Sequence, residues 1–182
     1  MEIRVRRLIL VAALMFFYSQ TFAQPYKRLT VNDFKGTPAN NGDGAIAYTN
    51  CTIVYSYSAR PERDYYVLTF YIKLIMNSDR SWMNLSTIGS REMLEEILKH
   101  EQGHYNISYM EQQELLRTVG RTVFRADYHR VADNIFDRIE AKYKKLNQNY
   151  DTDTQNSTNR VQQHSWDAYF QQRLNYMPIA KN

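Results

Sequence analysis

The sequence is short of cysteine, proline and glycine, and each shortage excludes a class of protein. A chain of 182 residues with one cysteine, Cys51, cannot form an internal disulfide, so it is not a disulfide-stapled domain. With 6 glycines and 4 prolines it is neither a fibrous nor a low-complexity chain. Stability must therefore come from packing, and a hydrophobic fraction of 43% is enough for one globular domain with a real core.

The sequence also lacks an apolar run of the roughly 20 residues that a membrane-spanning helix needs. One apolar run of 11 residues, Leu8 to Tyr18, follows Arg4, Arg6 and Arg7 and precedes a polar stretch that ends at Ala23. This order is typical of a secretory signal peptide. We expect residues 1–23 to be removed and residues 24–182 to be exported, to the periplasm or the exterior, with no stable transmembrane anchor after cleavage. The alternative is an uncleaved N-terminal anchor.

A strong charge of either sign is missing as well. The net charge is +4, and it falls to +2 when residues 1–23, with three arginines and one glutamate, are removed. A balance this weak gives no support to nucleic-acid binding, so we expect no nucleic acid among the partners.

The sequence does contain a clear strand pattern, followed by a helical one. Residues 47–58 and 64–76 are rich in β-branched and aromatic residues and are joined by a short connector, which predicts an antiparallel hairpin. In its second strand one face carries five apolar side chains, so this side should pack on the core. These side chains are Tyr66, Leu68, Phe70, Ile72 and Leu74.

The helical pattern predicts two long helices. From Ser90 onward, Met93, Ile97, His100, His104 and Ile107 recur at steps of three and four residues, so they share one face of a helix that starts at Ser90. A second helix is expected after Gly120, with apolar residues from Phe124 to Leu146 and a lysine-rich end at residues 142–145. The polar closing segment, residues 148–165, predicts a loop or a disordered tail. A cluster of Trp166, Tyr169 and Phe170 could dock it onto the body.

The residues His100-Glu101-Gln102-Gly103-His104 follow the pattern H-E-x-x-H. Side chains four residues apart project from one helix face, so the two imidazoles can converge on one Zn²⁺ about 2.1 Å away. Glu101 is adjacent to that face, where it can act as general base toward a water that zinc activates. The alternative is a pair of core histidines that are hydrogen-bonded to polar neighbours.

A zinc site also needs a third protein ligand. Glu111 shares the histidine face but lies two turns beyond His104, about 10.5 Å along the helix, which is too far. If Gly120 forms a tight turn, His104 faces residues near 136, where the acids point away from the apolar stripe; they are Asp133, Asp137 and Glu140. The remaining candidates are in the closing segment: Asp151, Asp153 and His164.

Several segments together resemble a bacterial family. They are "RLTVNDFKG", "AYTNCTIVYSY", Ser81–Trp82, "LKHEQGHYNI" and the closing residues Tyr150, Asp151, Asp153, Thr154, Gln163 and Trp166. The family is domain of unknown function 922, whose members are regarded as secreted zinc-dependent proteases. The resemblance implies the same activity here and favours Asp153 as the third ligand, because the family's closing pattern has an acidic residue there. The chain departs from the family's usual residues at three positions, with Asn106 for Asp, Tyr109 for Glu and Asn156 for His.

These observations lead to one expected function and one alternative. We expect an α+β protein in which a small N-terminal antiparallel sheet packs on a zincin-like helical core with two long helices. It would be a secreted zinc metallopeptidase that acts on a peptide or protein, with His100 and His104 as Zn²⁺ ligands and Glu101 as the catalytic base. The edge of the hairpin would pair with an extended substrate. The alternative is a non-catalytic periplasmic or surface binding protein with an incomplete zinc shell, which the departures at residues 106, 109 and 156 favour.

Overall fold

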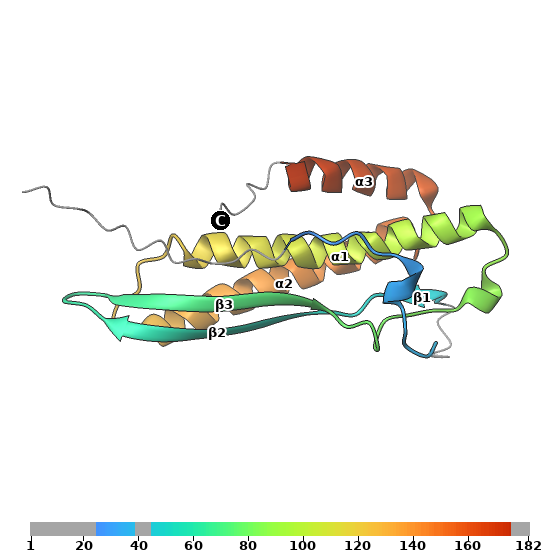
Figure 1. Cartoon of the computed structure of the whole chain (residues 1–182). Helices are drawn as coiled ribbons and strands as arrows, with labels where there is room; N and C mark the ends of the chain where they lie inside the picture. The colour runs from blue at the N-terminus through green and yellow to red at the C-terminus, as the bar shows by residue number, and fades with distance from the viewer. Residues whose placement is uncertain (1–24, 39–44, 176–182) are drawn as a thin grey trace, which may run out of the picture.

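The computed structural model describes residues 25–38 and 45–175, so the expected signal peptide lies outside the described residues. The fold is α+β, as predicted (Figure 1). In chain order its strands and α-helices are β1 (Ala47–Tyr48), β2 (Cys51–Pro61), β3 (Tyr66–Met76), β4 (Trp82–Met83), α1 (Arg91–Val119), α2 (Tyr128–Thr154) and α3 (Arg160–Asn175). Short 3-10 turns at Val31–Asp33 and Leu85–Thr87 precede β1 and α1.

The long strands β2 and β3 form the predicted antiparallel hairpin, in register from Cys51 opposite Met76 to Pro61 opposite Tyr66. The prediction began the first strand too early, because residues 47–48 form the separate strand β1, which pairs with β4. The inward face of β3 is confirmed: every second residue is buried, namely Leu68, Phe70, Ile72 and Leu74.

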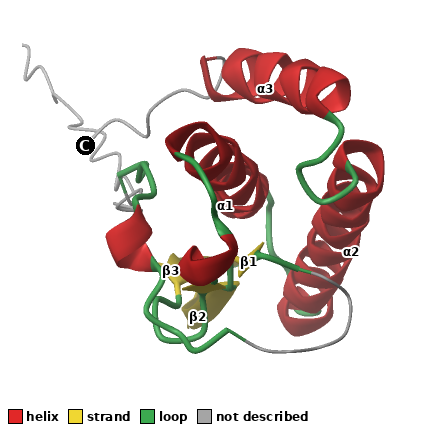
Figure 2. Cartoon of the chain, turned by 90° about the vertical axis from the view of Figure 1, so that its right-hand side faces the viewer, coloured by secondary structure: helices red, strands yellow, loops and turns green. Residues whose placement is uncertain are grey.

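The helices pack against this hairpin and against one another. Viewed along the helices, α1 lies between α3 on one side and the hairpin on the other, with α2 beside it (Figure 2). Helix α1 starts where predicted, because the Ser90 side chain accepts a hydrogen bond from the Met93 backbone N–H at 3.1 Å and so caps the helix. Within the described ranges no helix combines the length and the apolar character that a membrane crossing requires.

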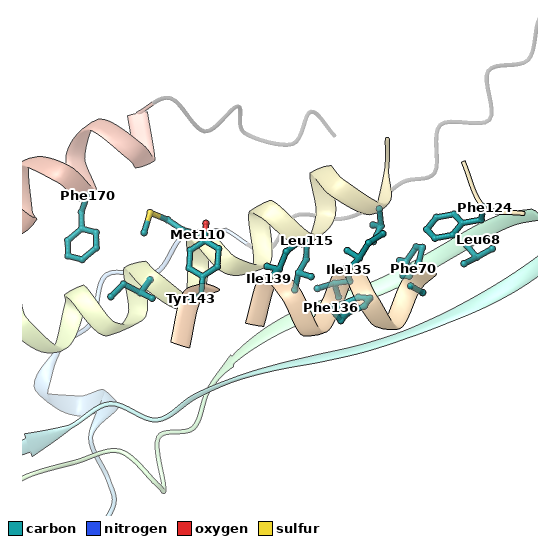
Figure 3. Close-up of a cluster of buried hydrophobic side chains, with 14 of the residues drawn as sticks. Leu68, Phe70, Met110, Leu115, Phe124, Ile135, Phe136, Ile139, Tyr143 and Phe170 are labelled. Atoms are coloured by element: carbon teal, nitrogen blue, oxygen red, sulfur yellow. The ribbon is translucent and has the colours of Figure 1, made fainter. Parts of the chain in front are cut away.

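The main core fills the space between the hairpin and the paired helices (Figure 3). It combines the inward face of β3 with apolar residues of α1 and α2, including Met110, Leu115, Ile135, Phe136 and Ile139. Phe170 of α3 is also part of this core. The predicted docking of the aromatic cluster is therefore confirmed, with Trp166 and Phe170 both packed edge-on against the Tyr150 ring.

The prediction of a loop or disordered tail over residues 148–165 is wrong. Helix α2 continues past the lysines to Thr154, a short turn follows in which Gln155, Asn156 and Ser157 have positive φ, and α3 begins at Arg160. The polar composition misled the prediction because three of the polar side chains here are buried and hydrogen-bonded, although most of the others are exposed. Tyr150 and Thr154 are 0% exposed and Gln163 is 1% exposed.

Candidate metal centre

The two motif histidines lie side by side on α1, one turn apart, as their spacing predicts. The Nε2 atoms of His100 and His104 are 3.2 Å apart. His100 is buried, with 4% of its surface exposed, whereas His104 is half-buried. With Glu101 they form a group whose ligand atoms lie within 4.8 Å of one another and could hold a metal ion.

A carboxylate from α2 completes this arrangement, and it belongs to Asp151. Its Oδ1 lies 3.1 Å from Nε2 of His104 and 3.6 Å from Nε2 of His100. The preference for Asp153 is corrected, because the Asp153 carboxylate instead accepts a hydrogen bond from Trp166 Nε1 at 3.1 Å. His164 is exposed on α3. Among the described residues, no contact joins it to His100 or His104.

The prediction that His104 faces residues near 136 is also wrong. His104 instead bonds to Asn147 and lies beside Asp151. The prediction assumed a tight turn at Gly120, but α2 begins only at Tyr128. In the connection Phe124 forms a β-bridge to Tyr66 of the hairpin, so the two helices meet in a shifted register.

Neighbouring amides fix the orientation of both imidazoles. Nδ1 of His104 lies 2.8 Å from the Asn147 amide oxygen, and Nδ1 of His100 lies 3.3 Å from the Gln163 amide oxygen. An amide oxygen can only accept, so each Nδ1 carries a proton, and each Nε2 faces Asp151 as the atom that can bind a cation, either a metal ion or a proton. Sequence analysis missed these two amides, because α2 and α3 bring them to the histidines from 43 and 63 residues away.

Tyr150 contacts the site at His100. Its hydroxyl donates to the His100 backbone oxygen at 3.0 Å and accepts from Gln163 Nε2 at 2.9 Å. Its ring stacks on the His100 imidazole with centroids 4.8 Å apart. The fully buried tyrosine thus holds α1, α2 and α3 together where the ligand atoms meet.

Three acceptor atoms therefore converge in a partly buried place, which is unfavourable unless a cation lies between them. In the metal-free protein the cation is a proton. Burial lowers the pKa of His104, but the hydrogen bond to Asp151 and the charges of Glu101 and Asp151 outweigh it and raise this pKa to about 9. Burial raises the pKa of Asp151, yet hydrogen bonds and charge from both histidines hold it well below its usual range.

The same three atoms fit a tetrahedral metal ion. Ligands about 2.0–2.1 Å from a tetrahedral Zn²⁺ lie about 3.3–3.4 Å from one another. The separations of 3.2, 3.1 and 3.6 Å found here are close to that spacing. The donor set of two imidazole nitrogens and one carboxylate oxygen is one that zinc accepts with a fourth position left open.

Glu101 lies next to the histidines and is held by Thr49. The Thr49 hydroxyl donates to Glu101 Oε2 at 2.6 Å, and both side chains are buried. The other carboxylate oxygen, Oε1, has no hydrogen-bond partner among residues 25–38 and 45–175. One oxygen is therefore fixed while the other can take a proton, which suits a general base. Sequence analysis missed Thr49, since no local pattern connects it to a helix 52 residues away.

The two middle residues of the motif have structural roles. Gln102 reaches the N-terminal segment: its amide oxygen accepts from the Leu29 N–H at 2.7 Å and its nitrogen donates to the Lys27 carbonyl at 3.2 Å. Gly103 faces the Tyr150 ring, where a Cβ atom would overlap the phenol group. The glycine between the histidines is what lets α2 approach closely enough to bring Asp151 to them.

The three departures from the resembled family lie in two different places. The Asn106 side chain accepts a hydrogen bond from the Tyr26 hydroxyl at 2.7 Å, and Tyr109 packs edge-on against the Tyr26 ring. Both therefore contact the N-terminal segment. Asn156 lies in the turn after α2 and lines the same cavity as His100, His104 and Asp151.

This cavity, with a volume of about 770 Å³, opens over the candidate metal centre. One face of α1 lines it, α2 forms one wall, and β1 and β2 with the residues between them form the other. All four chemistry-bearing side chains of the site, His100, Glu101, His104 and Asp151, line it. The candidate ligands therefore share one cavity, and the Asp151 side chain is 38% exposed.

Fold and site together define an α+β protein with a two-histidine, one-carboxylate group that can hold a metal ion. The chain belongs to the family described as bacterial protein of unknown function (DUF922), whose model matches residues 23–171. The resemblance seen in the sequence is thereby confirmed. No curated protein and no solved structure matches the chain.

Proposed function

We propose that this protein is an exported zinc metallopeptidase that hydrolyses peptide bonds. The observation that carries the proposal is the convergence of His100 Nε2, His104 Nε2 and Asp151 Oδ1 within 3.1–3.6 Å of one another, with their protons directed away. These three residues would hold Zn²⁺. When bound, zinc polarises a peptide carbonyl and lowers the pKa of water. Export rests on the sequence of residues 1–23.

The chain's own residues then have separate tasks. Glu101 takes a proton from the attacking water while the water oxygen bonds to the carbonyl carbon, and it passes that proton to the leaving amine as the C–N bond breaks. Thr49 keeps the Glu101 carboxylate in one orientation. Asn147 and Gln163 hold the imidazoles in the tautomer that leaves each Nε2 free to bind a cation.

The alternative, a non-catalytic binding protein, has lost part of its support. It drew on three departures from the resembled family, but Asn106 and Tyr109 contact the N-terminal segment and not the histidine pair. The Asp151 carboxylate lies 3.1 Å from Nε2 of His104, where it would supply the ligand that the alternative assumed to be missing. Asn156 remains as its one argument, because this residue lines the cavity.

The proposal is tested by two substitutions that should have different effects. Glu101→Gln should lower hydrolysis of a protein substrate such as casein by about 10²–10⁴-fold and leave zinc bound, because the glutamate transfers protons. His100→Ala should lose the zinc as well. Zinc content is measured by elemental analysis, and Glu95→Gln, exposed on the same helix, is the control. Unchanged hydrolysis in Glu101→Gln, or equal zinc loss in both variants, would refute the assignment of a general base.

A further inference from the structure

The cavity over the candidate metal centre continues along α1 as a groove. Its floor is the face of α1 that carries His104, Ile107 and Glu111, and one wall is α2 from Glu140 to Asp151. The far end is closed where the Tyr55 ring of β2 stacks on Phe136 of α2 with centroids 3.5 Å apart. The groove is lined along α1 from Ile97 to Leu115, and its closed end at Phe136 lies about three helical turns along α2 from Asn147, the partner of His104.

The opposite wall is formed by strand β2 and the residues that precede it. Cys51, Thr52, Ile53 and Tyr55 all line the groove. Among the described strands β2 pairs only with β3, so its other edge offers unpaired backbone N–H and C=O groups along this wall. An extended polypeptide fits such a wall, because it can add to the edge as a further strand.

The closed end of the groove is acidic. Glu111 projects from the floor and Glu140 from the α2 wall. Asp137 and Asp133 continue the line along the exposed side of α2, about one and two turns before Glu140 respectively. Lys144, the lysine that lines the groove, is exposed, and in the part of the chain described here no cation lies within ion-pair distance of these four acids.

The charged form of Glu111 is unfavourable without a partner. Burial, and then the charge of Glu140, raise its pKa to about 7. A half-buried carboxylate next to a second one is relieved by a cation that enters from outside. The acidic end is thus complementary in charge to an ammonium or guanidinium group.

We infer that the groove binds an extended, basic segment of polypeptide, with a lysine or arginine side chain of that segment placed between Glu111 and Glu140. The inference rests on the proposed function, which it extends by naming the substrate class. Glu111 is about 10.5 Å along α1 from His104. Two residues of extended chain cover about 6.6 Å, and a lysine side chain covers the rest. The basic residue therefore lies two residues to one side of the bond at the metal centre.

Peptide binding to the zinc-loaded Glu101→Gln protein tests this without cleavage. The probe is a short fluorescein-labelled peptide of alanine and serine with a lysine at every second position, and its matched forms carry glutamine or glutamate in place of lysine. We expect the lysine peptide to bind at least about tenfold more tightly than the glutamine form, as charge-assisted pairs would give, and the glutamate form to bind most weakly.

Adding Glu111→Gln and Glu140→Gln to the Glu101→Gln protein should abolish the preference for the lysine peptide. Glu62→Gln/Glu92→Gln, which removes two charges outside the groove, should keep it and so controls for net charge. Equal binding of the lysine and glutamine peptides, or a preference that survives loss of Glu111 and Glu140, would overturn the inference. If the lysine peptide binds as expected but the wild type cleaves no peptide, the proposed hydrolysis fails while the acidic groove for a basic segment stands.

Discussion

The interface between α1 and α2 is polar at one end and apolar at the other. At the polar end His100 and His104 meet Asn147, Tyr150 and Asp151 through hydrogen bonds of 2.8–3.1 Å. At the apolar end the same two helices meet through residues that are at most 7% exposed, namely Leu115, Val119, Ala132, Ile135, Phe136 and Ile139.

The difference shows what each end contributes. Burying apolar side chains stabilises the fold with no demand for exact partners, so the apolar end can hold the helices together alone. Burying histidine and aspartate costs free energy unless every polar atom is paired. The polar end therefore depends on exact pairing, and its hydrogen bonds hold the histidines and Asp151 in the arrangement that the proposed metal ion requires. Substitutions at the two ends should separate stability from metal binding.

The largest loss of stability is expected at the apolar end. Ile139→Ala should lower the free energy of unfolding by about 2–5 kcal/mol, because Ile139 is 1% exposed and its loss leaves a cavity. The zinc affinity of the folded protein should stay unchanged, since the ligand atoms lie elsewhere. Urea unfolding and a zinc competition assay measure the two quantities. A tenfold loss of zinc affinity in this variant would mean that the two ends are not independent.

Gly103→Ala should damage both properties. Alanine in a helix interior is usually better than glycine by about 1 kcal/mol, but here the added methyl group overlaps the Tyr150 ring, and such overpacking costs about 1–3 kcal/mol. The shift of α2 should also weaken zinc binding, because Asp151 moves with Tyr150. Gly89→Ala is the matched control, since a Cβ there meets nothing within 4 Å. Equal stability of the two variants would show that α2 adapts without moving the site.

The metal-free polar end should be sensitive to pH. The pKa of His104 is about 9 in the folded protein, and its ordinary value is 6.5. The stability that protonated His104 gives the fold is therefore fully present below pH 6.5 and is lost as the pH rises through about 9. We expect the free energy of unfolding to fall by on the order of 1–2 kcal/mol over this interval in zinc-free buffer. Urea titrations should show a flatter pH dependence in Asp151→Asn, and equal slopes in both proteins would contradict the ion pair.

The smallest effect is expected at Glu111, in the groove beside the apolar end. Its pKa is about 7 in the folded protein and 4.5 ordinarily, so its carboxylate destabilises the fold increasingly as the pH rises from 4.5 to 7. Glu111→Gln should therefore stabilise the protein by on the order of 1 kcal/mol at pH 8 and have little effect at pH 4. Thermal unfolding at both pH values measures this, and a gain of equal size at both would exclude charge as the cause.

The same contrast explains which features could be predicted from the sequence. The start of α1 and the inward face of β3 follow from local rules, because Ser90 caps the helix and alternate apolar residues define the strand face. The pair His100 and His104 follows from helical spacing. The end of α2 and all of α3 could not be recognised by composition, because Tyr150, Thr154 and Gln163 are buried where they contact His100 of the distant helix α1.

The candidate for a third ligand depends on the register between two helices, which local patterns do not contain. Residues 151 and 153 are both acidic and two positions apart, so they point to different sides of α2. In the register that places Tyr150 against Gly103, Asp151 faces the histidines and Asp153 faces Trp166.

Zinc affinity of three forms of the chain tests the central claim most directly. Competition with a calibrated chelator should give one tightly bound Zn²⁺ in the wild type, an affinity lower by at least about tenfold in Asp151→Asn, and an unchanged affinity in Asp153→Asn. The aspartates are close neighbours on one helix, so each variant controls for the charge lost in the other. Wild-type affinity in Asp151→Asn together with weak binding in Asp153→Asn would contradict the account.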